Sequence, residues 1–173
     1  RELTHVSGEV KFENVKFRYE QRGRPILDGI DIEVRPGQML AIVGPSGSGK
    51  TTLMALLMRF YDPLEGSVRL DGHDLRTLKQ GFLRRNIGTV LQDPLLFNDT
   101  IRNNIAYGRP DATLEQVKSA ARAANAEQFI VRLPQGFETM VGDRGSLLSA
   151  GERQRLAIAR ALLKDPPILV LDE

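Results

Sequence analysis

A glycine-rich stretch in the first third of the sequence carries residue types that could bind a phosphate chain: Gly44-Pro45-Ser46-Gly47-Ser48-Gly49-Lys50-Thr51. It matches the pattern G-x-x-x-x-G-K-[ST] at every fixed position. Glycines let the backbone turn around an anion with its N–H groups pointing inward, and a following helix adds unpaired N–H groups at the positive end of its dipole. Lys50 would supply a charge for the outer phosphates, and Thr51 would supply a hydroxyl for Mg²⁺. The loop therefore predicts binding of a nucleoside triphosphate, without indicating which class of phosphate-binding protein carries it.

A second group of candidate residues begins a predicted helix. Ser149 and Glu152 are spaced as a capping box, so the helix would begin at Ser149 and run to about Lys164. Its buried face would carry Leu156, Ala159 and Leu163. The free N–H groups and the hydroxyl at the start of this helix would face outward at a positive dipole end, which suits contact with an anion.

Apolar runs flank these candidate sites and would position them. The runs at 39–43, 87–91 and 168–171 are continuous, as expected of parallel strands that are covered on both faces. A helix is predicted from about 50 to 60, directly after the phosphate loop. The stretch from 93 to 164 is mostly helical in pattern and includes a second capping box, Thr113 with Gln116. The alternation of strands and helices favours an α/β fold with a parallel sheet.

The N-terminal part has the alternating pattern of exposed strands. Residues 9–19 predict one or two edge strands, with a change of phase near Glu13-Asn14 that indicates a bulge or tight turn. A polar turn is expected at 21–25. Further short strands are predicted at 30–34 and at 68–70, the latter followed by an Asp71-Gly72 turn.

Composition restricts the function classes. The 173 residues include no cysteine, which excludes disulfides and thiolate metal sites. The net charge of +2 is too balanced to indicate a nucleic-acid partner, and the basic clusters at 83–86 and 153–160 are interpreted as solvated helix faces. No apolar run reaches the ~18–20 residues that cross a bilayer, so the chain as given is expected to be soluble.

Further segments, in order along the chain, resemble motifs of the nucleotide-binding domain of ABC transporters. The stretch 148–155 is similar to the LSGGQ signature, and 168–173 is similar to the Walker B strand. Gln92 matches the Q-loop glutamine, and Tyr19 matches the aromatic residue that stacks on adenine. The resemblance implies a P-loop NTPase (RecA-like) core with a parallel sheet, an N-terminal antiparallel β subdomain and an inserted helical subdomain. The corresponding divisions would be 1–92, 93–164 and 165–173.

The resemblance also implies a role for each matching residue. ATP would be held by the aromatic residue and the phosphate loop, namely Tyr19, Gly44, Pro45, Ser46, Gly47, Ser48, Gly49, Lys50, Thr51 and Thr52. Mg²⁺ would be held by Thr51, Gln92 and Asp172. Catalysis would depend on Glu173 as the general base, assisted by Lys50 and Gln92. The signature residues would contact ATP bound to a second copy of the domain, and these are Leu148, Ser149, Ala150, Gly151 and Glu152.

Two signature positions depart from the family pattern. Ala150 replaces the first glycine, which would cost ~1 kcal/mol if the position needs a positive φ. Glu152 replaces glutamine, which improves the capping box and adds a negative charge near the nucleotide. With both changes, function is still expected, but tight closure of the signature on the partner's ATP is in question.

Other stretches resemble the exporter subclass. They are 96–105 after the Q-loop glutamine, 142–145 before the signature, and 6–10, which is similar to the linker that leaves a membrane domain. The resemblance implies a transmembrane domain fused upstream and a position on the cytoplasmic face of a membrane. Because the family's D-loop and switch histidine would follow Glu173, the chain is expected to be a truncated domain that is inactive alone.

Three alternatives remain open from the sequence. Ala150 motivates a regulatory module that binds ATP without efficient hydrolysis. A soluble ABC protein of repair or translation lacks a transport role, and the exporter-like stretches argue against it. A small-molecule P-loop kinase is contradicted by the signature helix.

Overall fold

The computed structural model describes residues 1–20 and 24–172. Two compact units make up the chain, Arg1–Ile87 and Gly88–Glu173. The polar turn predicted at 21–25 falls mainly on residues 21–23, which lie outside the described residues.

The first unit is built on an antiparallel sheet of four strands: β1 (Val10–Phe17), β2 (Leu27–Val34), β3 (Glu65–Leu70) and β4 (His73–Asp74). The strand order is β2-β1-β3-β4. Strand β1 thus pairs on both sides, with β2 and with β3. The prediction of an edge strand at 9–19 is therefore wrong, because its partners are separated from it in sequence and leave no local signal.

The predicted change of phase in β1 is confirmed. The pairing register shifts between Phe12 and Val15 on the β2 side, and Asn14 has a φ of 45°. Phe12 and Val15 are consequently both buried, with two exposed residues between them. On the β3 side, Gly66 lies against this irregularity with a φ of 79°, and a Cβ there would overlap the carbonyl oxygens of Glu13 and Asn14. Only glycine fits at this point of the sheet.

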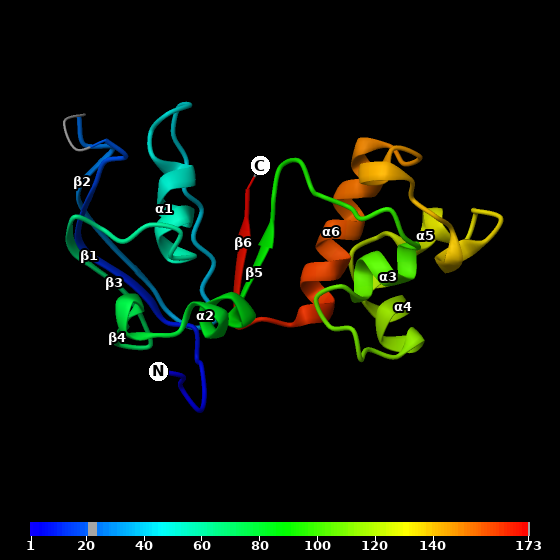
Figure 1. Cartoon of the computed structure of the whole chain (residues 1–173), viewed down its shortest axis with the longest axis horizontal. Helices are drawn as coiled ribbons and strands as arrows, with labels where there is room; N and C mark the ends of the chain where they lie inside the picture. Colours follow the sequence, from blue (N-terminus) through cyan, green and yellow to red (C-terminus); the bar gives the residue numbers. More distant parts are fainter. Residues whose placement is uncertain (21–23, 173) are drawn as a thin grey trace. The chain divides into compact units, whose positions relative to one another are not determined.

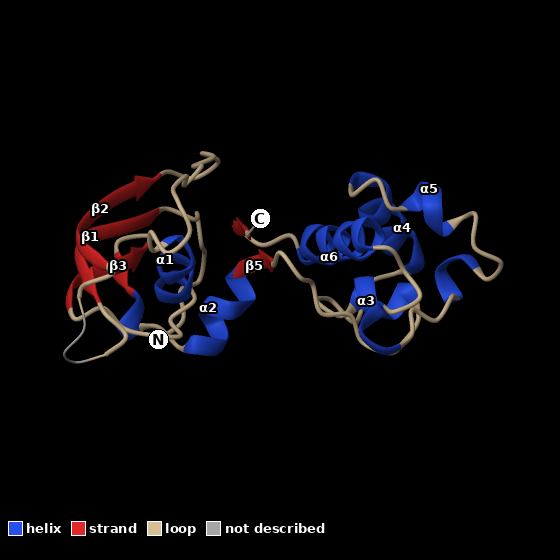
Figure 2. Ribbon diagram, turned by 90° about the horizontal axis from the view of Figure 1, so that it is seen from above, coloured by secondary structure: helices blue, strands red, loops and turns tan. Residues whose placement is uncertain are grey.

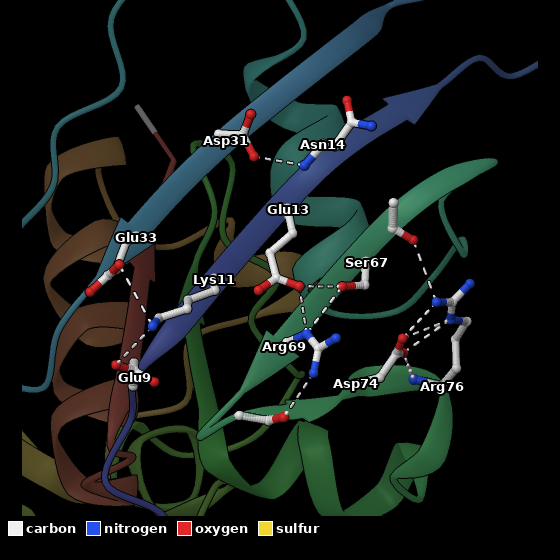
Figure 3. Close-up of polar contacts among 12 residues, drawn as sticks. Glu9, Lys11, Glu13, Asn14, Asp31, Glu33, Ser67, Arg69, Asp74 and Arg76 are labelled. Carbon is white, nitrogen blue, oxygen red and sulfur yellow. Dashed lines mark hydrogen bonds and ion pairs between the residues drawn. The ribbon is translucent and has the colours of Figure 1, made fainter.

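Polar pairs cross the outer face of this sheet (Figure 3). Glu13 on β1 accepts hydrogen bonds from Ser67 Oγ at 2.9 Å and from Arg69 Nε at 2.6 Å, both on β3. These bonds hold the pKa of Glu13 below its ordinary value, the Ser67 bond first and the Arg69 bond second. The Asp71-Gly72 turn, with φ values of 48° and 75°, joins β3 to β4, as its sequence predicted.

Helix α1 (Lys50–Leu57) and helix α2 (Gln80–Asn86) complete the first unit, with a short 3-10 turn, η1 (Leu75–Thr77). Leu56 of α1 and Leu83 of α2 are fully buried in its core. The basic stretch 83–86 is therefore not simply a solvated face: its two arginines are exposed, but Leu83 is a core residue.

The strand predicted at 39–43 is absent from the structure. Met39 is 94% exposed and Val43 89% exposed, and the segment has no strand geometry. A strand covered on both faces needs hydrogen-bonded neighbours, and none of the described strands pairs with this segment. The prediction from the apolar pattern is therefore wrong, because a local pattern cannot specify the strands that would have to pair with it.

The second unit contains a two-stranded sheet and the helices between its strands. Strands β5 (Ile87–Val90) and β6 (Ile168–Leu171) pair and run in the same direction (Figure 1). Between them come α3 (Ile101–Ala106), α4 (Leu114–Ala123), α5 (Glu127–Ile130) and α6 (Ala150–Lys164), with the 3-10 turns η2 (Gly136–Glu138) and η3 (Asp143–Gly145) (Figure 2). Both predicted capping boxes are present, at Thr113 and at Ser149. The helices therefore form the insertion between two strands that the sequence predicted.

Packing in the second unit follows the predicted faces in part. Leu156, Ala159 and Leu163 of α6 are buried against α3 and α4. Strand β6 differs from the prediction of full burial, because its residues alternate and Leu171 is 58% exposed. Alternation of this kind indicates a strand with one covered face. Within the described residues, no helix is long and apolar enough to span a membrane.

Candidate functional site

The phosphate loop has an open, turned backbone. Residues 44–48 are exposed, and the N–H of Ser48 donates to the carbonyl of Pro45 at 3.2 Å. Gly47 and Gly49 have φ values of 79° and 96°. A Cβ on Gly49 would lie 2.8 Å from Leu27 Cδ2, so position 49 has neither the backbone conformation nor the space for a side chain.

Helix α1 begins directly after this loop without a side-chain cap. Its N-cap is Gly49, which has no group to accept from the first N–H donors. Uncapped donors at a helix start are a favourable place for an anion. The predicted arrangement of loop and helix is therefore present in the structure.

Lys50 folds back over the loop. Its ammonium donates to the carbonyl of Gly44 at 2.7 Å and to the carbonyl of Pro45 at 2.9 Å. The charge is thereby held beside the loop before any anion binds. Thr51 is exposed, whereas Thr52 is buried on the inner face of α1.

Tyr19 lies next to the phosphate-loop helix. Its hydroxyl is 3.2 Å from Thr52 Oγ1, and its ring packs in T-shaped geometry against Phe17 and Tyr61. The structure therefore brings Tyr19 and Thr52, two of the predicted nucleotide ligands, into contact. Tyr61 was missed by sequence reasoning; its only signal is the aromatic pair Phe60-Tyr61 just after the helix.

The start of α6 points its polar groups outward. Ser149, Ala150 and Gly151 are exposed, and Leu148 is buried. Ala150 lies in the first turn of the helix and is not among the residues with a positive φ. The strain that a left-handed backbone would cause at this alanine therefore does not arise.

The hydroxyl of Ser149 is hydrogen-bonded to Glu152. Its carboxylate accepts from Ser149 Oγ at 2.7 Å and from the Ser149 N–H at 2.8 Å. These bonds, the hydroxyl first and the N–H second, lower the pKa of Glu152 below its ordinary value of 4.5. To bind a phosphate, the Ser149 hydroxyl would have to donate to the phosphate in place of this carboxylate.

Gln92 and Asp172 follow the ends of paired strands. The N–H of Asp172, after β6, donates to the carbonyl of Val90 at the end of β5 at 2.9 Å. Gln92 is exposed and comes two residues after Val90. These two residues therefore share one edge of the sheet, as expected at the carboxyl ends of parallel strands. Glu173 lies outside the described residues.

Arg160 of α6 forms hydrogen bonds with the segment that follows Gln92. It donates to the carbonyl of Leu95 at 2.9 Å, to the carbonyl of Asn104 at 2.8 Å and to Asn104 Oδ1 at 3.1 Å. Its guanidinium also lies over the rings of Phe97 and Tyr107, and its burial lowers its pKa. The interpretation of 153–160 as a solvated face is wrong at this position, because the partners of Arg160 are distant in sequence.

The donor types available for a metal are those that suit Mg²⁺ bound together with a nucleotide. Thr51 offers a hydroxyl, Gln92 an amide oxygen and Asp172 a carboxylate. Among the described residues, no group of three or more His, Cys, Asp or Glu side chains could hold a metal ion. Mg²⁺ commonly binds through one or two carboxylates together with water and phosphate oxygens. Each of the three side chains is thus of a donor type that Mg²⁺ accepts.

Comparisons with known proteins agree with this geometry. The sequence profile of the ABC transporter family matches residues 27–173. The chain is 56% identical over 168 residues to the ATP-dependent lipid A-core flippase of Chromohalobacter salexigens, covering 97% of this chain and 29% of the relative. It is 54% identical over 172 residues to the β-(1→2)glucan export ATP-binding/permease protein NdvA of Brucella suis biovar 1, covering 99% of this chain and 28% of the relative.

A solved structure of a bacterial Atm1-family ABC exporter with ATP bound has the same fold. It superimposes with a TM-score of 0.92 at 50% identity, and the match covers 100% of this chain and 31% of that one. The chain spans less than a third of the length of the relatives it matches. Because the family profile covers residues 27–173, most of the sequence, the chain belongs to the ABC transporter family.

Proposed function

We propose that this chain is the ATP-binding and ATP-hydrolysing domain of an ABC exporter. The observation that carries the proposal is the loop at 44–51, which is exposed, turned by left-handed glycines and followed by an uncapped helix start. The Lys50 ammonium beside it provides the charge that a triphosphate needs. The ordinary helical backbone of Ala150 removes backbone strain as a reason for the alternative of a module that only binds ATP.

The proposed reaction is in-line hydrolysis of ATP. Water attacks the γ-phosphorus, the bond to the β–γ bridging oxygen breaks, and ADP and inorganic phosphate leave. Glu173 accepts the proton from the attacking water. Lys50 and the partner subunit's Ser149 stabilise the negative charge on the transferring group.

The Mg²⁺ ion, when bound, would neutralise charge on the β- and γ-phosphate oxygens. The residues that would hold it are Thr51, Gln92 and Asp172. Gln92 would also help to orient the attacking water.

The proposed partners are a second ATPase domain and a membrane domain in the same protein. Names of relatives that combine "ATP-binding" with "permease" support the fused arrangement. The start of α6 supports contact with a second copy, because Ser149, Ala150 and Gly151 are exposed at a helix N-terminus, a position that favours anions. The domain would then lie at the cytoplasmic face of a membrane, and ATP-driven pairing of the two domains would drive export.

The test is hydrolysis by the full-length protein with Glu173→Gln. Removing the general base while keeping the shape should leave ATP affinity within about twofold and lower phosphate release by roughly 100-fold or more. ATP affinity is measured by calorimetry without Mg²⁺, and turnover by steady-state phosphate release.

Glu115→Gln is the matched control. Glu115 lies on α4, its side chain is exposed, and its one described ion pair is with Lys118. The control should hydrolyse ATP at the wild-type rate. Wild-type turnover in the Glu173→Gln variant would remove Glu173 as the base, and a wild-type protein without ATPase activity would reject hydrolysis as the function.

A further inference from the structure

Three aromatic rings form a cluster beside the phosphate-loop helix. The centroids of Phe17 and Tyr19 are 5.0 Å apart, those of Tyr19 and Tyr61 5.2 Å, and those of Phe17 and Tyr61 5.5 Å. Phe17 is buried, whereas Tyr19 is 51% exposed and Tyr61 48% exposed. The cluster therefore has a fixed base in the core and two rings that are half open to solvent.

The orientation of Tyr19 is determined on several sides. Its ring is nearly perpendicular to Phe17 at 89° and to Tyr61 at 83°. Its hydroxyl is within hydrogen-bond distance of the Thr52 hydroxyl on α1. Rotation of the Tyr19 ring would break these contacts together, so Tyr61 and Thr52 restrict the plane in which Tyr19 can offer a face to a ligand.

Tyr61 also links the cluster to the phosphate loop through the chain. It follows α1, whose first residue is Lys50, while Tyr19 follows strand β1. A contact between the two tyrosines therefore joins the end of β1 to helix α1, which directly follows the phosphate loop. A flat ligand attached to a phosphate chain needs this kind of fixed spacing between its two recognition points.

We propose that Tyr61 is a positioning residue for the nucleotide base: it holds the ring of Tyr19 in the plane required for stacking. This inference rests on the proposed ATP site. Tyr61 acts through Tyr19 and not by its own contact with the nucleotide. Edge-to-face aromatic pairs have interaction energies that correspond to roughly 2- to 12-fold in an equilibrium constant.

The experiment compares ATP with inorganic tripolyphosphate, which has the phosphate chain but no base. Dissociation constants are measured by calorimetry on the full-length protein without Mg²⁺. Tyr61→Ala should weaken ATP binding roughly 2- to 12-fold and leave tripolyphosphate binding within experimental error. Tyr61→Phe, which keeps the ring, should bind ATP within about twofold of wild type.

Two further variants separate positioning from general effects. Phe60→Ala removes the neighbouring exposed ring, which is not part of the cluster, and should leave ATP affinity unchanged. In a Tyr19→Ala background, Tyr61→Ala should cause no additional loss, because the ring that it positions is gone.

Each contrary result has a distinct meaning. Equal weakening of ATP and tripolyphosphate by Tyr61→Ala would show a structural role in the phosphate loop and overturn the proposal. A loss that persists without Tyr19 would show direct contact with the base and also overturn it, as would no loss at all. If the wild-type protein bound neither ligand, the ATP site itself would be rejected, whereas failure of the Tyr61 proposal alone leaves ATP binding intact.

Discussion

The buried side chain of Asn104 forms hydrogen bonds with several separate parts of the second unit. Its amide donates to the carbonyls of Phe97 and Thr100, and its Oδ1 accepts from the Phe97 N–H and from Arg160. A buried amide with all its polar atoms bonded stabilises one arrangement of the backbone around it. Here that backbone is the segment that follows Gln92, which Arg160 also holds through the carbonyl of Leu95.

Replacement of Asn104 by alanine should destabilise the protein by roughly 2–4 kcal/mol, since the Phe97 N–H and one N–H of Arg160 would lose their acceptor and the buried amide would leave a cavity. Urea denaturation measures the change in the free energy of unfolding. Asn103→Ala is the matched control, because Asn103 is the neighbouring residue and its exposed amide bonds Asp99. The control should cost less than about 1 kcal/mol, and equal losses in the two variants would contradict the role given to Asn104.

At the scale of elements, the start of α6 depends on its capping box. Glu152 accepts from the hydroxyl and the N–H of Ser149, and the Glu152 N–H donates to Ser149 Oγ at 3.4 Å. The first two bonds favour the charged carboxylate and lower the pKa of Glu152. Protonation of Glu152 would therefore weaken the cap.

The pH dependence follows from the direction of that shift. A carboxyl whose folded-state pKa is lowered adds stability that is complete above its unfolded-state pKa and is lost as the pH falls through the folded-state value. Glu152→Gln keeps an acceptor for the cap but does not titrate. The difference in unfolding free energy between wild type and this variant should thus shrink as the pH falls from about 6 through the ordinary carboxyl value of 4.5 and below. A difference that stays constant or grows across that range would show that the Glu152 charge does not support the cap.

Local signals in the sequence predicted the helix caps, turns and bulges that depend on them, but not which strands pair with each other. The capping boxes at Thr113 and Ser149, the bulge near Asn14 and the Asp71-Gly72 turn depend on residues close in sequence, and all are present. The segment 39–43 was misjudged because pairing depends on strands elsewhere in the chain.

The same distinction explains the candidate site. The phosphate loop and the start of α6 are continuous motifs, and their backbone conformations follow from glycines and caps within them. Tyr61 and Arg160 have no local motif: Tyr61 meets Tyr19 from across the first unit, and Arg160 bonds a residue 65 positions earlier. Positioning residues of this kind become visible only when the contacts are known.

At the scale of the whole molecule, the candidate residues divide between the two compact units. Arg1–Ile87 contains Tyr19 and the phosphate loop, and Gly88–Glu173 contains Gln92, the start of α6 and Asp172. Each unit has buried side chains of its own, such as Leu56 in the first and Leu156 in the second. Separate cores allow the two units to open locally with different free energies.

ATP without Mg²⁺ should therefore stabilise the first unit selectively, because binding to a folded site alone adds about 2.7 kcal/mol at a ligand concentration of 100 times Kd. Amide hydrogen exchange of the full-length protein measures the stabilisation of each unit separately. Amides of α1 that exchange by opening of the unit should slow by about 100-fold, which is that energy expressed as a ratio, while amides of α4 should keep their rates. Lys50→Met should remove the protection at the same ATP concentration by weakening phosphate binding, whereas Lys79→Met, at an exposed position of the same unit, should retain it. Equal slowing in α1 and α4 would mean that the two units unfold together, and protection that survives Lys50→Met would place ATP away from the phosphate loop.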